Sequence, residues 1–402
     1  MDVTKLTEKP IDQLSREEAG LLVDHYKQLS AKYTAYEQAV KLTLNSIYGA
    51  FGNKWFHFFN INIAESITKQ GKDAILYSEA ILNKYCQEFW HKDTKVHEQF
   101  GLTVKGKVEK PAVIYIDTDS CYVQFQDLYE TIVWNDESKA LPIDEFILAF
   151  YAFRLKDYIT ACMKKYADTR NTDNFLFFEL ESLAYNGIWM SKKKYIQNIA
   201  WDDKLETTER HPSLKKVKTI GFDTIQSSTP KFAREKLVEA LRILFKSQKT
   251  PGAEELQQLV TFMKKAKKEF QLADIDDITF NRRTNNIEKY IVDDQIEFQV
   301  GLKCPANVKA AGYYNYVLNQ NKKYKNKYKV IGNGEKLKIY NCKTPISEVY
   351  AYLPGEHPYE IAPQVDFDTQ FEKCMIDPLN RVLKAIGLQT LDTNLIYASA
   401  LF

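Results

Sequence analysis

The chain has 402 residues, of which 45% are apolar and 27% charged, a composition that suits two or three packed domains of a globular protein. No run of about 18 apolar residues occurs, which excludes a membrane-spanning helix, and the first residues lack a basic and then apolar secretory pattern. The six cysteines are scattered without a CxxC pair, so a structural zinc site is not expected. We therefore expect a cytoplasmic protein with reduced thiols and no membrane partner.

Basic residues are concentrated in one part of the chain. Residues 190–340 contain 30 Lys and Arg against 18 Asp and Glu, a net charge of +12, whereas the remainder has a net charge of −10. Such a distribution favours a polyanionic partner, because each neutralised phosphate releases a counterion. Solvated lysine faces would give the same distribution, so charge alone leaves both interpretations open.

The predicted elements form a mixed sequence of helices and strands. A capping box at Ser15–Glu18 indicates the start of a long helix, which Gly49 and Gly52 should end. Residues 90–111 are polar, with Gly101 and Gly106, and predict an excursion before a strand. Helical patterns cover about 15–47, 64–89, 143–168, 230–247 and 252–271.

Two β-rich runs, AVIYI and CYVQF, lie within residues 112–125 and are joined by DTDS, which predicts a hairpin. Residues 174–200 alternate enough to be extended in part. Since the strands do not alternate regularly with helices, the sequence predicts an α+β fold.

Asp117 and Asp119 lie two residues apart at the junction of the predicted hairpin. In an extended segment, side chains at this spacing point to the same face. Adjacent carboxylates repel one another unless a cation lies between them, and two Mg²⁺ ions completed by substrate phosphates suit the arrangement. A polar turn is the alternative, but the apolar strands on both sides favour a site.

The helix before the hairpin places Lys41, Asn45 and Tyr48 on one row. Such a row can offer a cation, an amide and a flat ring to one ligand, although a lone row of this kind is usually a solvated face. A separate apolar row, which we expect to pack inward, comprises Val40, Leu44 and Ile47.

The motifs KxxxNSxYG at 41–49 and YxDTDS at 115–120, in this order, resemble the second and third conserved motifs of family B DNA polymerases. The run SKKKY at 191–195 resembles the KKRY segment of that family, with Lys194 in place of its arginine. GFDTIQSSTP at 221–230 and GLKCP at 301–305 are similar to thumb segments of the T-even bacteriophage polymerases. The adjacent Asp-Asp pair of reverse transcriptases is absent, which disfavours an RNA-templated enzyme.

The resemblance implies a role for each matching residue. It implies that the catalytic residues, which hold two Mg²⁺ ions, are Asp117 and Asp119. It assigns the contacts to the incoming nucleotide to Lys41, Asn45, Tyr48 and Gly49. It assigns primer-template contacts to Lys192, Lys193, Lys194 and Tyr195, with Glu181 as the acidic residue that precedes them. Lysine lacks the planar fork of arginine, so a bidentate contact at position 194 is not implied.

The family motif DxxSLYPS, whose aspartate is the other main metal ligand, does not occur in residues 1–40, and the exonuclease region is absent. We therefore expect a polymerase divided between two chains, with an amino-terminal polymerase and exonuclease chain as partner. A natural division and a cut polypeptide both fit this interpretation. The expected domains are partial fingers (1–58), a palm with the DTDS hairpin (59–200), a mostly helical thumb (201–390) and a tail (391–402).

The function that these patterns predict is template-directed DNA synthesis from deoxynucleoside triphosphates on primer-template DNA, in the host bacterial cytoplasm if a phage encodes the chain. A non-catalytic DNA-binding or clamp-tethering subunit is the alternative. The chain ends in Leu401 and Phe402, and we expect this apolar pair to dock on a sliding clamp. Folding of the same residues back on the thumb is the competing interpretation.

Overall fold

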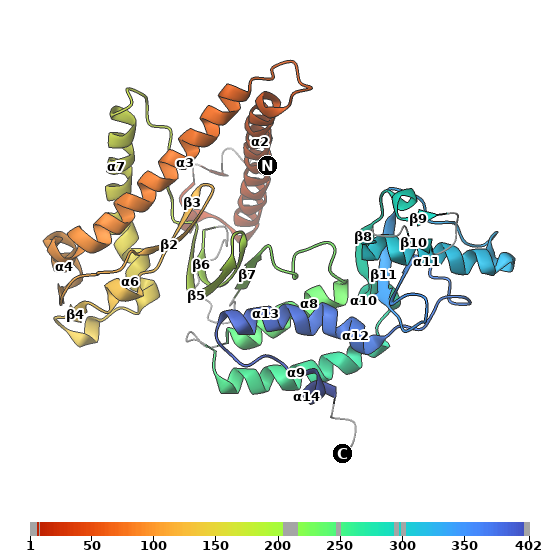
Figure 1. The fold of residues 1–402 in the computed structure, drawn as a ribbon. Helices are drawn as coiled ribbons and strands as arrows, with labels where there is room; N and C mark the ends of the chain where they lie inside the picture. Colours follow the sequence, from red (N-terminus) through yellow and green to blue (C-terminus); the bar gives the residue numbers. More distant parts are fainter. Residues whose placement is uncertain are drawn as a thin grey trace. The chain divides into compact units, whose positions relative to one another are not determined.

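The computed structural model describes residues 6–7, 9–203, 216–246, 251–292, 297–298 and 303–397. Its helices and small antiparallel sheets confirm the predicted α+β class. The chain divides into two compact units (Figure 1), an amino-terminal unit of residues 1–143 and 152–178 and a carboxyl-terminal unit of residues 144–151 and 179–402. The finer division into fingers, palm, thumb and tail stays a prediction.

The amino-terminal unit is built mainly from helices, with two small antiparallel pairs of strands, β1 with β4 and β2 with β3. Its helices are α2 (Arg16–Gly52), α3 (Ile61–Lys84), α4 (Thr94–Phe100), α5 (Gln126–Tyr129) and α7 (Lys156–Asp168). Its strands are β1 (Leu102–Val104), β2 (Val113–Asp117), β3 (Ser120–Val123) and β4 (Ile132–Trp134).

Helix α2 starts at the predicted capping box. The hydroxyl of Ser15 accepts a hydrogen bond from the backbone N–H of Glu18, and the Glu18 carboxylate accepts one from the backbone N–H of Ser15. Lys9 also donates to Glu18 at 2.8 Å. The helix then runs through Gly49 and ends at Gly52, the second of the two predicted stop signals.

The apolar row of α2 does not pack inward, so that expectation is wrong. Val40, Leu44 and Ile47 are 59%, 62% and 47% exposed. The physical reason is that α2 meets α3 near their connecting turn, where Asn60 donates to the carbonyl of Phe51, and that its buried residues are confined to the first two turns. Most of the helix therefore lacks a packed neighbour among the described residues.

Helix α3 is the framework on which the hairpin β2–β3 packs (Figure 1). The side-chain oxygen of Asn83 accepts a hydrogen bond of 2.9 Å from the backbone N–H of Val113 at the start of β2. On α3 and α7, Tyr77 donates to the carbonyl of Cys162 and Tyr158 to that of Ile81. These bonds hold the hairpin, α3 and α7 together.

The excursion predicted at 90–111 precedes β2 and contains regular structure of its own. It contains α4 and β1, and β1 pairs with β4, a strand about thirty residues further on. Asp93 is buried and accepts hydrogen bonds from Tyr85 and Arg154. The polar local pattern gave no indication of this order, because its partners lie far along the chain.

The carboxyl-terminal unit contains helices and two three-stranded antiparallel sheets among its described residues, with strand orders β5-β6-β7 and β12-β11-β8. Its helices are α6 (Ile143–Phe150), α8 (Lys231–Leu244), α9 (Ala253–Leu272), α10 (Ile275–Ile278), α11 (Ala306–Gln320), α12 (Phe367–Phe371), α13 (Asp377–Ala385) and α14 (Thr393–Tyr397). Its strands are β5 (Ser182–Ser191), β6 (Lys194–Asp202), β7 (Lys216–Ile220), β8 (Phe280–Arg283), β9 (Ile291–Val292), β10 (Glu297–Phe298), β11 (Lys336–Asn341) and β12 (Val349–Tyr352).

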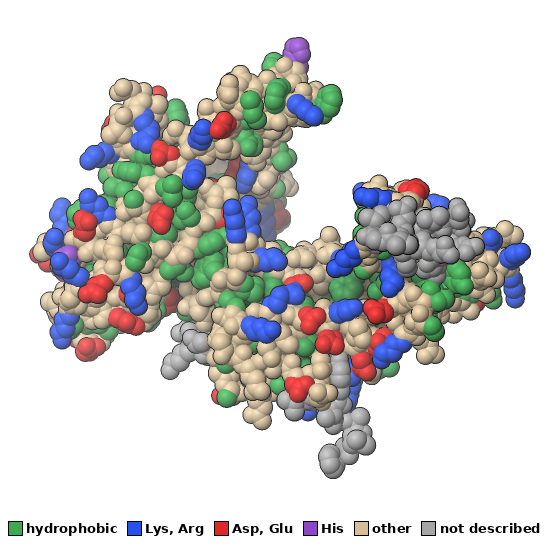
Figure 2. Space-filling view, in the orientation of Figure 1, with side chains coloured by type: hydrophobic (Ala, Val, Ile, Leu, Met, Phe, Trp, Pro, Cys, Tyr) green, Lys and Arg blue, Asp and Glu red, His purple; other side chains and the backbone are tan. Residues whose placement is uncertain are grey.

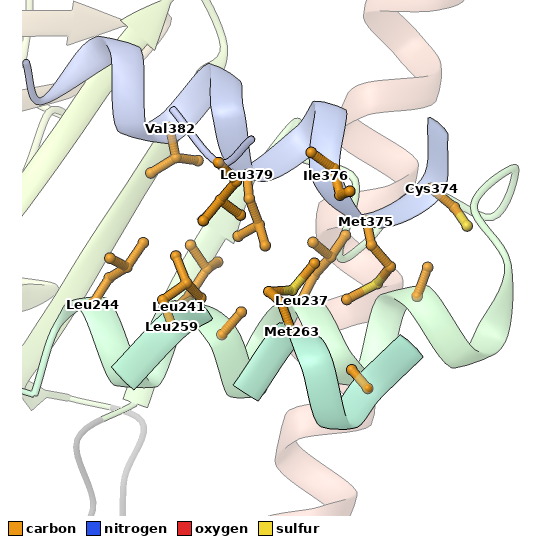
Figure 3. Close-up of a cluster of buried hydrophobic side chains, with 14 of the residues drawn as sticks. Leu237, Leu241, Leu244, Leu259, Met263, Cys374, Met375, Ile376, Leu379 and Val382 are labelled. Carbon is orange, nitrogen blue, oxygen red and sulfur yellow. The ribbon is translucent and has the colours of Figure 1, made fainter. Parts of the chain in front are cut away.

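Helices α8, α9 and α13 enclose the main apolar core of this unit (Figure 3). Leu237 and Leu241 of α8, Leu259 and Met263 of α9, and Leu379 of α13 are fully buried. Each such side chain stabilises the fold by roughly 1.5–3 kcal/mol through removal of apolar surface from water. Ile196 of β6 belongs to the same core, so this helical layer supports the sheet β5-β6-β7.

A second core lies between α11 and the sheet β12-β11-β8. It is rich in tyrosine, and Tyr314, Tyr340, Tyr350 and Tyr352 are fully buried. The stretch 201–390, predicted to be mostly helical, thus also contains a small sheet with its own core.

Candidate active site

The two candidate catalytic carboxylates lie at the tip of the predicted hairpin, which the structure confirms. Strand β2 ends at Asp117, β3 begins at Ser120, and these two residues are paired across the hairpin. Thr118 and Asp119 form the two-residue turn between them. The rings of Tyr115 and Tyr122, one on each strand, lie 5.5 Å apart just below the turn. The hairpin therefore presents Asp117 at a strand end and Asp119 in the turn.

The turn is tighter than the extended geometry that the sequence analysis assumed. Thr118 has φ of 52°, in the left-handed region, and the backbone N–H of Asp119 donates to the carbonyl of Asp117 at 2.6 Å. A β-branched residue seldom adopts this conformation, which costs of order 1–3 kcal/mol and is found most often at functional sites. The assumption that both carboxylates lie on one extended strand is therefore wrong for Asp119.

Hydroxyl groups on both sides fix the conformation around Asp117. The Thr118 hydroxyl donates to the Asp117 carboxylate at 3.1 Å, and the Ser120 hydroxyl donates to the backbone carbonyl of Asp117 at 3.1 Å. Asp117 is half-buried and Asp119 is exposed. The turn therefore offers one oriented carboxylate and one that is open to solvent.

Carboxylate oxygens are the ligands that Mg²⁺ prefers, so the donor set fits this ion. Within the part of the chain that the structure describes, no group of three or more His, Cys, Asp or Glu side chains could hold a metal. A metal ion bound at this turn would thus find two carboxylates, Asp117 and Asp119, among the described residues.

The candidate nucleotide-binding residues form one row on α2. Lys41, Asn45 and Tyr48 follow one another at helical spacing, and all of them are exposed, as is Gly49. Helix α3 packs against both α2 and the hairpin, so the row and the carboxylates belong to one unit.

The candidate DNA-binding lysines lie in the turn between β5 and β6, in the carboxyl-terminal unit. Ser191 pairs with Lys194, which leaves Lys192 and Lys193 as a two-residue turn, and all three lysines are exposed. Tyr195 is only 6% exposed and its ring stacks on Trp189. The tyrosine therefore supports the turn from within the sheet, while the lysines project from it.

Glu181 does not lie beside the lysine turn. It precedes the first residue of β5, whereas the turn follows the last, so the strand separates them by roughly 30 Å at about 3.3 Å per residue. Its carboxylate forms an ion pair of 3.7 Å with Lys218 of β7. Glu181 and Lys192 therefore lie at opposite ends of the hairpin formed by β5 and β6.

Residues 23–134 match the family described as DNA polymerase family B. This stretch contains both the row on α2 and the carboxylate hairpin. The chain is 24% identical over 365 residues to the DNA-directed DNA polymerase of Enterobacteria phage T4, which covers 87% of this chain and 37% of that protein.

Two further relatives agree with this similarity. The chain is 29% identical over 293 residues to the DNA-directed DNA polymerase of Escherichia phage RB69, covering 70% of this chain and 29% of that protein. A stretch of 68 residues is 35% identical to the DNA polymerase alpha catalytic subunit of Dictyostelium discoideum, covering 17% of this chain and 4% of that protein. The chain thus spans about a third of the length of the two phage polymerases it matches.

The sequence analysis missed two residues that the structure places beside the candidate sites. Asn83 holds the backbone of β2, and Gly221 lies directly after β7 against the backbone of Lys193. Asn83 lies inside a regular helical pattern and gave no indication of its role. Gly221, an isolated glycine after a run of strand-forming residues, could have indicated a close backbone approach.

The predicted clamp-binding pair, Leu401 and Phe402, lies outside the described residues, and its role stays a prediction. Leu391 and Ile396, in the predicted tail, are buried in the core formed by α8, α9 and α13. At least these two side chains of the tail pack on the helices. In the described ranges, no helix is long and apolar enough to cross a membrane.

Proposed function

We propose that this chain catalyses template-directed DNA synthesis, by nucleotidyl transfer, as the carboxyl-terminal part of a family B DNA polymerase. The observation that carries the proposal is the strained turn that presents Asp117 and Asp119 at the tip of the hairpin, within the stretch that matches the family. The row of Lys41, Asn45 and Tyr48 on the same unit supports it.

In this proposal, Asp117 and Asp119 hold Mg²⁺. The bound ions would lower the pKa of the primer 3′-hydroxyl and neutralise charge on the transferred phosphoryl group. Lys41 binds the triphosphate as a cation, and Asn45 donates a hydrogen bond beside it. Tyr48 and Gly49 present a flat surface to the new base pair. Such a surface selects base pairs of the correct shape without reading a particular sequence.

The turn of Lys192, Lys193 and Lys194 binds the backbone of the primer-template DNA. Lysine contacts to phosphate give affinity and register without reading bases, as a general copying enzyme requires. The exposure of Lys192 and Lys193 in the two-residue turn, and of Lys194 at the start of β6, supports this role.

We further propose that a separate amino-terminal chain supplies the remaining metal ligand, an aspartate of a DxxSLYPS motif. The exposed row of α2 supports such a partner. Tyr33, Tyr36, Val40, Leu44 and Ile47 recur at spacings of three or four residues and are all exposed. A row with this spacing is typical of a surface that packs against another helix.

The central test is primer extension by the chain together with its partner, in the presence of Mg²⁺. Asp119→Ala should reduce the rate at least a hundredfold, because a metal ligand is lost where the transition-state charge develops. Binding of primer-template DNA and thermal unfolding should stay unchanged, since Asp119 is exposed.

Asp24→Ala, which removes an exposed carboxylate of α2, serves as the control and should keep full activity. Extension at a near-normal rate by Asp119→Ala would defeat the catalytic proposal and favour a non-catalytic DNA-binding subunit.

The partner proposal has its own test. Leu44→Ser should leave the unfolding of the isolated chain unchanged, since the side chain is exposed, but should weaken association with the amino-terminal chain. Lys27→Ser, at an exposed position outside the apolar row, is the matched control. Equal association of the wild type and Leu44→Ser would show that the row of α2 is not the contact surface.

A further inference from the structure

The lysine turn adopts a conformation that its own sequence does not favour. Lys193 has φ of 59°, in the left-handed region that glycine and asparagine adopt more readily than lysine. A strained residue of this kind persists only where the surrounding structure determines its conformation.

Gly221 contacts the lysine turn from the end of β7. Strand β7 pairs with β6 so that Ile220 lies opposite Tyr195, which brings the next residue, Gly221, against the backbone of Lys193 and the side chain of Lys194. A Cβ atom on Gly221 would lie 3.2 Å from the carbonyl carbon of Lys193 and would overlap its carbonyl oxygen. Gly221 also has φ of 63°, so a side chain there would be strained as well as obstructed.

The segment after Gly221 is fixed at several points. Phe222 is buried in the core of α8, α9 and α13. Arg381 of α13 donates to the carboxylate of Asp223, and the side-chain amide of Gln226 donates to the carbonyl of Gly221 at 3.0 Å. The hydroxyls of Thr219 and Thr224 share a hydrogen bond of 2.6 Å. The segment around Gly221 is thus held by the helical core as well as by the sheet.

We propose that Gly221 is a positioning residue for DNA binding, through which the helical core fixes the backbone of the lysine turn. The absence of a side chain lets β7 approach Lys193 closely enough to impose its left-handed conformation. This inference rests on the proposed function, in which Lys192, Lys193 and Lys194 contact DNA phosphates.

Gly221→Ala should displace the turn and remove at least one phosphate contact. Each lost phosphate contact makes the slope of log K against log salt less steep by about 0.9. If the variant and the wild type bind equally at 1 M salt, the variant should bind roughly eightfold more weakly at 0.1 M salt. The measurement is the affinity of the whole chain for primer-template DNA across a salt series, with thermal unfolding of the same samples.

Gly334→Ala is the matched control. Gly334 has φ of 80°, so alanine suffers comparable backbone strain, but nothing lies within 4 Å of the added Cβ. The control should keep the wild-type salt slope. A loss of affinity in Gly334→Ala equal to that in Gly221→Ala would attribute the effect to strain alone and overturn the proposal.

A double-mutant cycle with the lysines distinguishes a loss of lysine positioning from a general loss of DNA binding. In a chain that carries Lys192→Ala, Lys193→Ala and Lys194→Ala, the change Gly221→Ala should have no further effect on the salt slope, because the groups it positions are gone. A further loss of the same size in that background would overturn the proposal.

The outcomes also distinguish this inference from the proposed function. If the triple lysine variant binds DNA as well as the wild type, the DNA-binding role of the turn fails, and with it the inference. If the triple variant binds weakly but Gly221→Ala binds normally, only the inference fails.

If Gly221→Ala does not fold, Gln226→Ala tests the same inference. It removes only the hydrogen bond to the Gly221 carbonyl, so it should lower the salt slope, and an unchanged slope would overturn the proposal.

Discussion

The carboxylate hairpin and the lysine hairpin have the same design but different support. Each joins two antiparallel strands through a two-residue turn, and each turn contains a residue other than glycine with positive φ, Thr118 at 52° and Lys193 at 59°. In the first, hydrogen bonds within residues 117–120 hold the conformation. In the second, Gly221, a distant residue, lies close against the backbone of Lys193, and we propose that this approach determines the conformation. Similar strained turns can therefore be specified locally or by tertiary contact.

Helix α2 and the helices of the core differ in whether their apolar residues are covered. The apolar residues of α8 and α9 are buried between neighbouring helices (Figure 3), whereas those on α2 remain exposed. The turn between α2 and α3 is also rich in exposed aromatic residues, with Trp55 86% exposed, and Figure 2 shows hydrophobic side chains on the surface of this region. Hydrophobic spacing thus predicts that a helix has an apolar face, but not that the same chain covers it.

The largest effect should come from the locally specified turn. Asp117→Asn keeps a side-chain oxygen to accept the hydrogen bond from Thr118, so the hairpin should fold normally. It removes one negative charge from the metal site, so primer extension should fall by about a hundredfold or more. Single-turnover rates, measured with saturating partner chain and Mg²⁺, would check this. A variant with normal rates would remove Asp117 from the set of metal ligands.

A smaller effect is expected at the turn that Gly221 supports. Lys193→Asn introduces a residue that tolerates positive φ, so the turn should be retained while one charge is lost. The slope of log K against log salt for primer-template DNA should then fall by about 0.9, with unchanged thermal unfolding. An unchanged slope would show that Lys193 does not contact phosphate.

The smallest effect concerns the start of α2, another locally specified feature. Hydrogen bonds from Lys9 and from the backbone of Ser15 lower the pKa of Glu18 to about 2, from an ordinary value near 4.5. Because the folded pKa is the lower one, this stabilisation is present above about pH 4.5 and is lost as the pH falls towards 2. Glu18→Gln should therefore lose less helicity than the wild type between pH 5 and 2, as measured by circular dichroism. Identical acid transitions in the two proteins would exclude the contribution.

The sequence determined the features whose causes are local. The capping box placed the start of α2, helical periodicity placed α3, α8 and α9, and the DTDS run between two β-rich segments placed the carboxylate hairpin. Each of these depends on residues within a few positions of one another, so a pattern in the chain is sufficient.

Features whose partners are distant in the sequence became evident only in the folded chain. It showed that β1, within residues 90–111, pairs with β4, that Glu181 lies at the opposite end of the hairpin from the lysine turn, and that Gly221 lies against the backbone of Lys193. It also showed that the apolar row of α2 stays exposed. The physical reason is that strand partners, close backbone approaches and burial arise from contacts between residues far apart in sequence, which periodicity and local propensity do not encode.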